Sequence, residues 1–356
     1  MFFRQTPRWT ATGEALTRAL LDRFAGQGLT AEGLGLVLVS HDAQGAAGFA
    51  HRGDWRCYPC SLVKSFHLVH ALAALEDGRV AAHGEMDRAL RDMIRWSSNT
   101  ATNYVIDLVT GTTGETLLEG AEYLDWVSKR ERLNRWFWAL GWPEWAGCNI
   151  TQKLMDDTRY GREAQYAGAE RQNLNALTPL AAARLFWELF EGDLPLSTPA
   201  RGRAQAILHR SKADPDAAMP DYQLSEYLGG DLPEGVEIWS KAGHNLWTGD
   251  PKASWFKHGM IRLTGKGRRP LIAVVMTFSV LFTFTDFQLI YVITRGGPLN
   301  ATHLMATLSF QRAISGGALG EGAAIAISMV PFLLAAILFS YFGLQRRAWQ
   351  QGGSDA

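Results

Sequence analysis

The stretch PCSLVKSFHLVHALAAL, from Pro59 to Leu75, places a lysine inside an apolar helical pattern. Its apolar residues recur at the spacing of one helix face, which predicts a largely buried helix. Lys64 lies one turn after Ser61, near the start of this helix. Burial of an unpaired ammonium is costly and favours its neutral form. A neutral amine on the same helix face can reach the serine hydroxyl and activate it as a nucleophile.

Two further segments contain polar residues at the ends of predicted elements. WSSNTATN places Ser97 and Asn99 at a junction between two helices, and WSKAGHN places Lys241 on a strand that ends in a turn. The Ser61 segment and the WSSNTATN segment also have a purely structural interpretation. Ser61 can be a helix cap with Lys64 reaching solvent, and Ser97 and Asn99 can cap the next helix.

Together the three segments have the order Ser-x-x-Lys, Ser-x-Asn, Lys-x-Gly, which is a motif set of penicillin-interacting serine enzymes. The sequence resembles the serine β-lactamase and DD-peptidase family over about residues 10–264. The resemblance implies acylation of a serine by an amide or ester, such as a β-lactam, followed by hydrolysis. It implies neither a metal nor an organic cofactor.

The resemblance also assigns roles to individual residues of the three motifs. The catalytic roles are Ser61 as the nucleophile, Lys64 as its general base or proton relay, and Ser97 as the proton donor to the leaving nitrogen. The binding roles are Asn99 for the substrate amide, Lys241 for Ser97 and the substrate carboxylate, and the strand residues Ala242, Gly243 and His244 along the substrate. The backbone N–H groups of Ser61 and His244 form the implied oxyanion hole.

Three departures from the family pattern affect these expectations. Ala242 lacks the hydroxyl that normally binds the substrate carboxylate, and Ser98 stands where aspartate is common. Class A β-lactamases use a glutamate for deacylation. Glu163 has suitable spacing but an unusual context, and Glu170 has the context without the spacing. The sequence therefore leaves rapid β-lactam turnover in doubt.

The soluble part is predicted to be an α/β sandwich with an antiparallel sheet flanked by helices. Strands are expected at LGLVLVSHD and AAGFAHRG near the N-terminus, and at VEIWSKAGH, ASWFKHGMIRL and RRPLIAVVMTF late in the chain. Helices are expected between them, at Thr10–Ala25, Met86–Trp96, after Thr100 and at Thr178–Glu191. One sheet is thus assembled from distant parts of the sequence.

The end of the chain has a different character. Residues 271–293 carry one charge and residues 322–344 carry none, which predicts two transmembrane helices. The basic residues beside the two spans place both ends, and the hydrolase, on the cytoplasmic side of the inner membrane. The predicted domains are a hydrolase at 1–269, a membrane hairpin at 270–347 and a polar tail at 348–356.

This C-terminal part resembles the last two membrane helices of a sugar ABC-transporter permease, most clearly in FQLIYVITRGGPLNAT. The earlier helices and the loop that docks on the ATPase are missing, so an ABC ATPase is not an expected partner. The two resemblances conflict at Leu271–Phe278, which is either the last sheet strand or the start of a membrane helix. A fusion of the two genes accounts for both parts.

A second function remains open, namely a membrane-anchored or transporter-associated protein with an inactive hydrolase fold. The net charge of zero argues against a nucleic-acid partner. Three cysteines are too few for a disulfide framework. We interpret His67 and His70 as packing residues, and the Trp-rich stretch at residues 130–145 as local core, with a lid or a membrane-contacting surface as the alternatives.

Overall fold

In the computed structural model the chain is described at residues 1–154, 159–245, 248, 251–265, 267–278, 305–315, 318–328 and 330–331. The first of two compact units contains Met1–Asp22 and Ala31–Phe278 and holds all three motifs. The second contains Arg23–Thr30 and the chain after Phe278.

One seven-stranded sheet forms the centre of the first unit, in the order β1-β3-β2-β7-β6-β5-β4. The strands are β1 (Arg4–Gln5), β2 (Leu34–Asp42), β3 (Gly45–His51), β4 (His209–Arg210), β5 (Val236–His244), β6 (Phe256–Gly265) and β7 (Leu271–Phe278). As predicted, its strands come from the two ends of the hydrolase segment. All pairs are antiparallel except β1 with β3, which is parallel and was not expected from the sequence.

Nine described α-helices lie between β1 and β4, and five of them match predicted segments to within a few residues. The four at 120–130, 132–138, 161–167 and 198–208 were not expected from the sequence. The nine are α1 (Pro7–Phe24), α2 (Val63–Glu76), α3 (Gly84–Arg95), α4 (Asn99–Thr110), α5 (Gly120–Arg130), α6 (Arg132–Trp138), α7 (Gly161–Ala167), α8 (Pro179–Phe190) and α9 (Thr198–Leu208). Capping side chains help to fix the N-terminal ends of these helices, as α8 shows. The Thr178 hydroxyl accepts from Ala181 N at 3.1 Å, and Pro179 occupies the first position of α8, where its missing N–H costs nothing.

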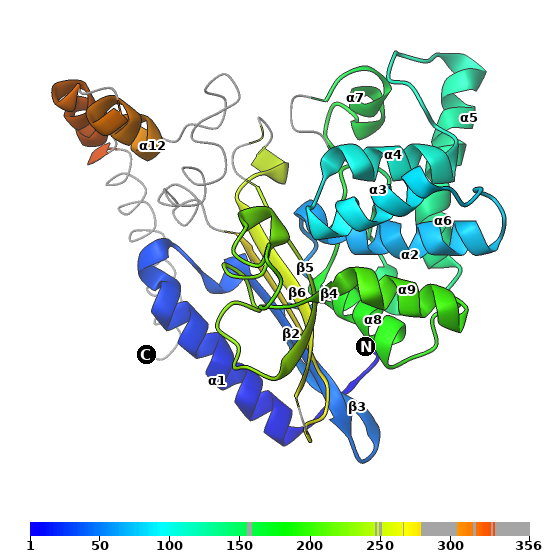
Figure 1. The fold of residues 1–356 in the computed structure, drawn as a ribbon, viewed down its shortest axis with the longest axis horizontal. Helices are drawn as coiled ribbons and strands as arrows, with labels where there is room; N and C mark the ends of the chain where they lie inside the picture. Colours follow the sequence, from blue (N-terminus) through cyan, green and yellow to red (C-terminus); the bar gives the residue numbers. More distant parts are fainter. Residues whose placement is uncertain are drawn as a thin grey trace, which may run out of the picture. The chain divides into compact units, whose positions relative to one another are not determined.

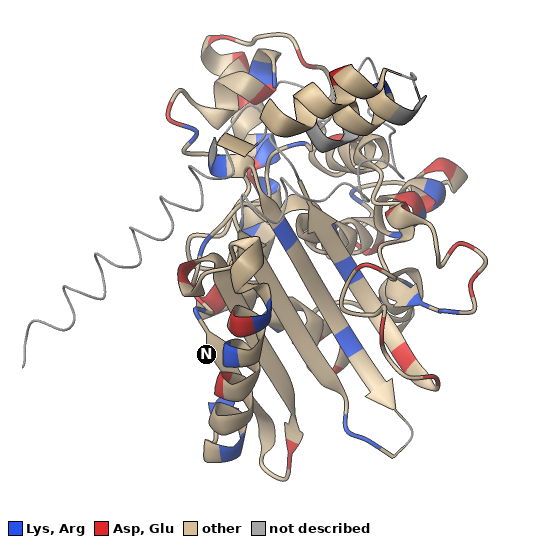
Figure 2. Ribbon diagram, turned by 90° about the vertical axis from the view of Figure 1, so that its left-hand side faces the viewer, with Lys and Arg blue, Asp and Glu red and all other residues tan. Residues whose placement is uncertain are grey.

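The helices form layers on both faces of the sheet (Figure 1). α2 to α9 lie on one side, where α8 contacts β2, β6 and β7, and α1 lies on the other. Gly13 of α1 faces Phe49 of β3 so closely that an added Cβ would lie 2.1 Å from the ring. Figure 2 shows acidic and basic residues along α1, whereas the central strands carry few charges.

The conflict over Leu271–Phe278 is resolved in favour of the strand. β7 pairs with β2 on one side and β6 on the other, so it lies in the interior of the sheet. Ile272, Val274 and Met276 alternate into the main core, each no more than 1% exposed. The predicted boundary after Arg269 is therefore too early, and the predicted membrane helix over 271–293 is wrong for its first eight residues.

The second unit is described only in part. It contains α12 (Met305–Phe310), a π-helical turn at Gln311–Ser315 and helical residues at 319–328. Within the described ranges, no helix has the length and apolar character needed to cross a membrane. The rest of both predicted spans, and the predicted tail at 348–356, lie outside the described residues.

Candidate active site

Ser61 lies in a short 3₁₀ turn, η3 (Cys60–Leu62), that leads directly into α2. The preceding Cys60 has a φ of 48°, a left-handed conformation that is uncommon for a residue with a side chain. The apolar face of α2 is buried in the main core, as the helical spacing predicts. Lys64 is fully buried one turn later, so both members of the first motif are held by a packed helix.

Ser97 connects the first and third motifs. Its Oγ lies 3.2 Å from Nζ of Lys64 and 3.0 Å from Nζ of Lys241. Lys64 Nζ also donates to the backbone carbonyl of Ser97. Ser97 has a φ of 53°, and strained residues of this kind persist where the surrounding contacts hold them, often at active sites. The structure thus brings three predicted residues together around one hydroxyl.

Asn99 adds a further polar group to this cluster. Its Oδ1 accepts from Lys64 Nζ at 2.7 Å. The adjacent Ser98 caps α4, because its Oγ accepts from Ala101 N at 3.1 Å. The cap of α4 is therefore Ser98, and not Ser97 or Asn99 as the capping interpretation expected, which leaves Ser97 and Asn99 directed toward Lys64.

Gly243 allows β5 to approach the η3 turn that contains Ser61. A Cβ added at Gly243 would lie 2.4 Å from the backbone N of Ser61 and 3.0 Å from Cβ of Cys60. No side chain fits into this space, so the glycine of the third motif is required by the close approach of two backbones. The residue after it, His244, is consequently brought beside Ser61.

The register of β5 determines where the N–H of His244 points. Asn245 N donates to Phe256 O at 2.9 Å, so these residues form a hydrogen-bonded pair. Such pairs alternate along an antiparallel ladder, and the next pair, His244 with Lys257, is therefore of the other kind. The N–H of His244 therefore points away from β6. The strand on the other side, β4, pairs with β5 only at residues 238–239, so it does not pair with this N–H. This orientation supports the predicted use of this amide as an oxyanion donor.

The side chain of His244 contacts Tyr227, a residue that the sequence did not single out. The phenol oxygen of Tyr227 lies 2.6 Å from Nδ1 of His244. Burial, together with the positive charges of Lys257 and Lys241, lowers the pKa of His244 to about 4. Ala242 is 2% exposed and offers only a methyl group in place of the usual hydroxyl.

Lys241 is buried among neutral oxygens. Its side chain is 1% exposed, and its Nζ contacts the neutral oxygens of Ser97, Gln223 and Ala242. Within the described residues it makes no ion pair with a carboxylate. Burial first, and then the charges of Lys64 and Arg210, lower its pKa well below the usual value.

Glu163 lies in a different cluster. Its Oε1 is 2.7 Å from Nη1 of Arg130, and its Oε2 accepts from the backbone N of Lys153 at 3.4 Å. Among the described residues, neither Ser61 nor Lys64 is a partner of this carboxylate. The predicted role of Glu163 in deacylation therefore has no support from its position, because an ion pair with a buried arginine already holds it. Glu170 is exposed.

The remaining sequence interpretations concern packing. His67 and His70 are buried on α2, and His67 Nε2 lies 2.8 Å from the carbonyl of Ile150. In the Trp-rich stretch, Phe137 and Trp145 are fully buried and stack with centroids 4.8 Å apart, which confirms the local core. The three cysteines are buried and free.

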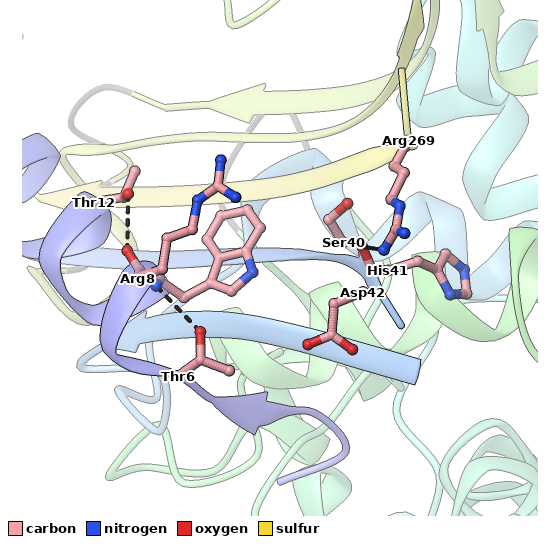
Figure 3. Close-up of a pocket in the computed structure, with 8 residues that line it drawn as sticks. Thr6, Arg8, Thr12, Ser40, His41, Asp42 and Arg269 are labelled. Atoms are coloured by element: carbon pink, nitrogen blue, oxygen red, sulfur yellow. Dashed lines mark hydrogen bonds between the residues drawn. The ribbon is translucent and has the colours of Figure 1, made fainter. Parts of the chain in front are cut away.

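A separate hollow of about 590 Å³ lies between the start of α1 and the sheet (Figure 3). It is three strands away from β5 in the sheet order. Polar groups along its wall already have partners: Asp42 pairs with Arg4, Ser40 Oγ donates to Pro270 O at 2.6 Å, and Arg269 donates to the carbonyl of His41. This hollow contributes no residue to the cluster around Ser97.

Comparison with known proteins places this geometry in a family. The family model of the β-lactamase enzyme family matches residues 85–283, more than half of the chain, and the chain belongs to this family. The structure titled "Structure of PBP-A" is similar to it over 78% of this chain and 89% of the other, with a TM-score of 0.51 and 18% identity. This likeness shows a β-lactamase-like fold.

Two further solved structures are also similar. One is an ancestral class A β-lactamase, with 19% identity, coverage of 75% of this chain and 94% of that chain, and a TM-score of 0.49. The other is a β-lactamase from Burkholderia vietnamiensis, with 17% identity, coverage of 74% and 87%, and a TM-score of 0.48.

A short segment is similar to transporter proteins instead. It is 38% identical over 78 residues to a putative ABC transporter permease protein of Caldicellulosiruptor sp. (strain Rt8B.4), covering 22% of this chain and 56% of that protein. A probable ABC transporter permease protein of Brucella suis biovar 1 (strain 1330) matches at 32% over 66 residues, 18% of this chain and 23% of the other. The chain thus spans little more than half, or about a quarter, of these relatives.

Proposed function

We propose that this protein is a serine hydrolase that is acylated at Ser61 by an amide or ester of the β-lactam type. The observation that carries the proposal is the position of Ser97 Oγ, within hydrogen-bond distance of both Lys64 and Lys241. Such a hydroxyl can relay a proton between two buried amines next to a nucleophile. Helix capping alone does not require this arrangement.

The first step is the attack of Ser61 Oγ on the substrate carbonyl. The proton of Ser61 passes to the amine of Lys64, one turn along the same helix. Lys64 Nζ is hydrogen-bonded to Ser97 and Asn99, and catalytic hydrogen bonds often tighten only when substrate binds. The developing oxyanion accepts from the backbone N–H groups of Ser61 and His244.

The second step is release of the leaving group. Ser97 Oγ donates its proton to the leaving nitrogen and recovers one from Lys64, while Lys241 holds the hydroxyl in place. Hydrolysis of the ester on Ser61 by water then frees the enzyme. Because Glu163 is paired with Arg130, this chain has no evident carboxylate to activate that water among the described residues. We therefore expect a long-lived acyl-enzyme.

The test uses intact mass spectrometry of the full chain after incubation with a penicillin. The expected result is one covalent adduct on the wild type that persists for hours and is absent in Ser61→Ala. An adduct that disappears within seconds would support efficient turnover instead. An unmodified wild type that is fully folded would favour the alternative of an inactive hydrolase fold.

We further infer that the chain is a fusion whose permease-like part follows β7 and attaches it to the inner membrane, with the hydrolase on the cytoplasmic side. The permease matches support this, and the partial coverage of those relatives argues against transport. Membrane fractions washed with alkaline carbonate should retain the full chain. Protease added to spheroplasts should leave the hydrolase intact, and its digestion from outside would contradict the assigned side.

A further inference from the structure

Lys241 is oriented by a side chain that belongs to none of the three motifs. An ammonium has three donors, and Nζ of Lys241 contacts three oxygens. They are Ser97 Oγ at 3.0 Å, the carbonyl of Ala242 at 2.5 Å, and Oε1 of Gln223. Nζ donates to the amide oxygen of Gln223, so this oxygen, and not the NH₂ group, faces Lys241.

The backbone at Gln223 is held in an unusual conformation that directs this amide. Gln223 follows the 3₁₀ turn η5 (Pro220–Tyr222), and its φ of 57° is uncommon for a residue with a Cβ. Its N–H donates to the carbonyl of Pro220 at 3.0 Å, and the residue is 6% exposed. The neighbouring Tyr222 is anchored by its hydroxyl, which accepts from Ser211 N at 3.2 Å. The turn thus holds a buried polar side chain against the site.

The acceptor supplied by Gln223 is neutral, which matters for the charge on Lys241. The titratable and charged groups that act on Lys241 are Lys64 on α2, Arg210 on β4, Cys60 on η3 and Asp221 on η5. The two cations and burial itself disfavour the ammonium, whereas Asp221 and Cys60 favour it. A glutamate at position 223 would add a full negative charge next to Nζ and reverse this balance.

We propose that Gln223 is a positioning residue that fixes Nζ of Lys241 on Ser97 Oγ while adding no negative charge beside that amine. This inference rests on the proposed acylation of Ser61 and deepens it. Because the acceptor is neutral, the pKa of Lys241 stays low enough for its amine to exchange a proton during the reaction. Ser97 is consequently oriented by an amine that can gain or lose a proton as protons move through Ser97.

The experiment compares Gln223→Glu and Gln223→Leu with the wild type by two readouts. The first is the titration of Lys241 in the full chain, followed by NMR of lysine labelled with ¹³C at Cε. The resonance is assigned by its loss in Lys241→Arg. We expect the pKa of Lys241 to rise by at least one unit in Gln223→Glu and to fall in Gln223→Leu. An unchanged titration in both folded variants would overturn the proposal.

The second readout is the rate of acylation by a fluorescent penicillin between pH 5 and 10. In Gln223→Glu the alkaline limb of the pH–rate profile should shift to higher pH, together with the pKa of Lys241. In Gln223→Leu the limiting acylation rate should fall about ten-fold or more, whereas the concentration for half-saturation changes little. Parallel losses in both quantities, with an unshifted limb, would indicate a merely structural role and contradict the proposal.

Gln152→Leu is the matched control, because Gln152 is also buried but lies against Glu163, outside the site. It should lower the melting temperature without moving the alkaline limb. If Gln223→Leu does not fold, Gln223→Glu decides the question through the sign of its shift. A wild type without an adduct would overturn the proposed function, whereas the NMR titration would still decide the role of Gln223.

Discussion

Two clusters of buried charges in this protein differ in the partners of their cations. In one, Arg130 and Lys153 each face a carboxylate, with Glu163 at 2.7 Å and Asp107 at 2.8 Å respectively. In the other, the contacts of Lys241 are all neutral oxygens, and its amine shares the hydroxyl of Ser97 with Lys64.

This difference suits one cluster to a structural role and the other to a chemical role. In the paired cluster each cation lies at ion-pair distance from a carboxylate, which favours the charged form of the cation. A cation held by neutral acceptors remains close to losing its proton, which is the property that a proton relay needs. The first cluster therefore stabilises the helical layer, and the second is suited to reaction. Equivalent substitutions in the two clusters should therefore have different consequences.

The largest expected effect is the loss of the lysine nearest the nucleophile. Lys64→Met should lower the acylation rate by about 10²–10⁴-fold, the usual contribution of a general base. Lys153→Met is the matched control, since Lys153 is also buried but belongs to the paired cluster. It should cost stability and leave acylation of the folded protein unchanged. Equal acylation by the two variants would contradict the distinction.

The next effect concerns the contact between β5 and the η3 turn that contains Ser61. Gly243→Ala forces a methyl group against the backbone N of Ser61, so the two oxyanion donors move apart. Acylation should fall by about 10²–10³-fold, as when one oxyanion donor is removed. Gly202→Ala on α9, where an added Cβ meets nothing within 4 Å, should have no such effect. Stopped-flow acylation by a fluorescent penicillin measures both variants.

Breaking the paired cluster tests its structural role. Glu163→Gln leaves Arg130 buried without its carboxylate, which should lower the free energy of unfolding by about 3 kcal/mol. Urea denaturation measures this loss. The decay of the acyl-enzyme, followed by intact mass on the folded protein, should be unchanged. A decay slowed many-fold with little loss of stability would instead restore Glu163 as the deacylating base.

The smallest effect per group is an acid-dependent loss of stability. Burial lowers the pKa of His258 to about 4 and that of His70 to about 3. An unfolded histidine takes up its proton near pH 6.5, whereas these folded ones remain neutral. The unfolded state therefore binds more protons as the pH falls below about 6.5, and stability decreases down to about pH 4.

The slope of this loss approaches about 1.4 kcal/mol per pH unit for each such group. His258→Gln should reduce the slope between pH 6 and 5, as measured by urea denaturation at each pH. His51→Gln, at a partly exposed position, is the control and should leave the slope as it is. A slope in His258→Gln equal to that of the wild type would exclude His258 as a contributor.

The sequence allowed most of the fold and the three motifs to be predicted, because both follow from local patterns. The alternating residues of β7 indicated a strand, although their unbroken apolar composition also fitted a membrane helix. Their central position in the sheet explains that composition, since both faces of an interior strand are covered. The motif residues Ser61, Ser97 and Lys241 were found by spacing and order.

The surroundings of Gln223 and Glu163 could not be predicted from the sequence, and for the same physical reason. Their roles depend on partners that are distant along the chain, Lys241 in one case and Arg130 in the other. Gln223 lies in an irregular segment with no periodic pattern, and no motif includes it. Glu163 had suitable spacing, but spacing gives no information about the arginine that neutralises it.

The measurement that tests the central claim most directly is the site of modification by a penicillin. The full chain is incubated with the drug, digested, and the modified peptide sequenced by mass spectrometry, with Ser61→Ala in parallel. The account predicts a single acylated residue, Ser61, and no adduct in the variant. Modification of another residue, or an adduct that survives in folded Ser61→Ala, would contradict it.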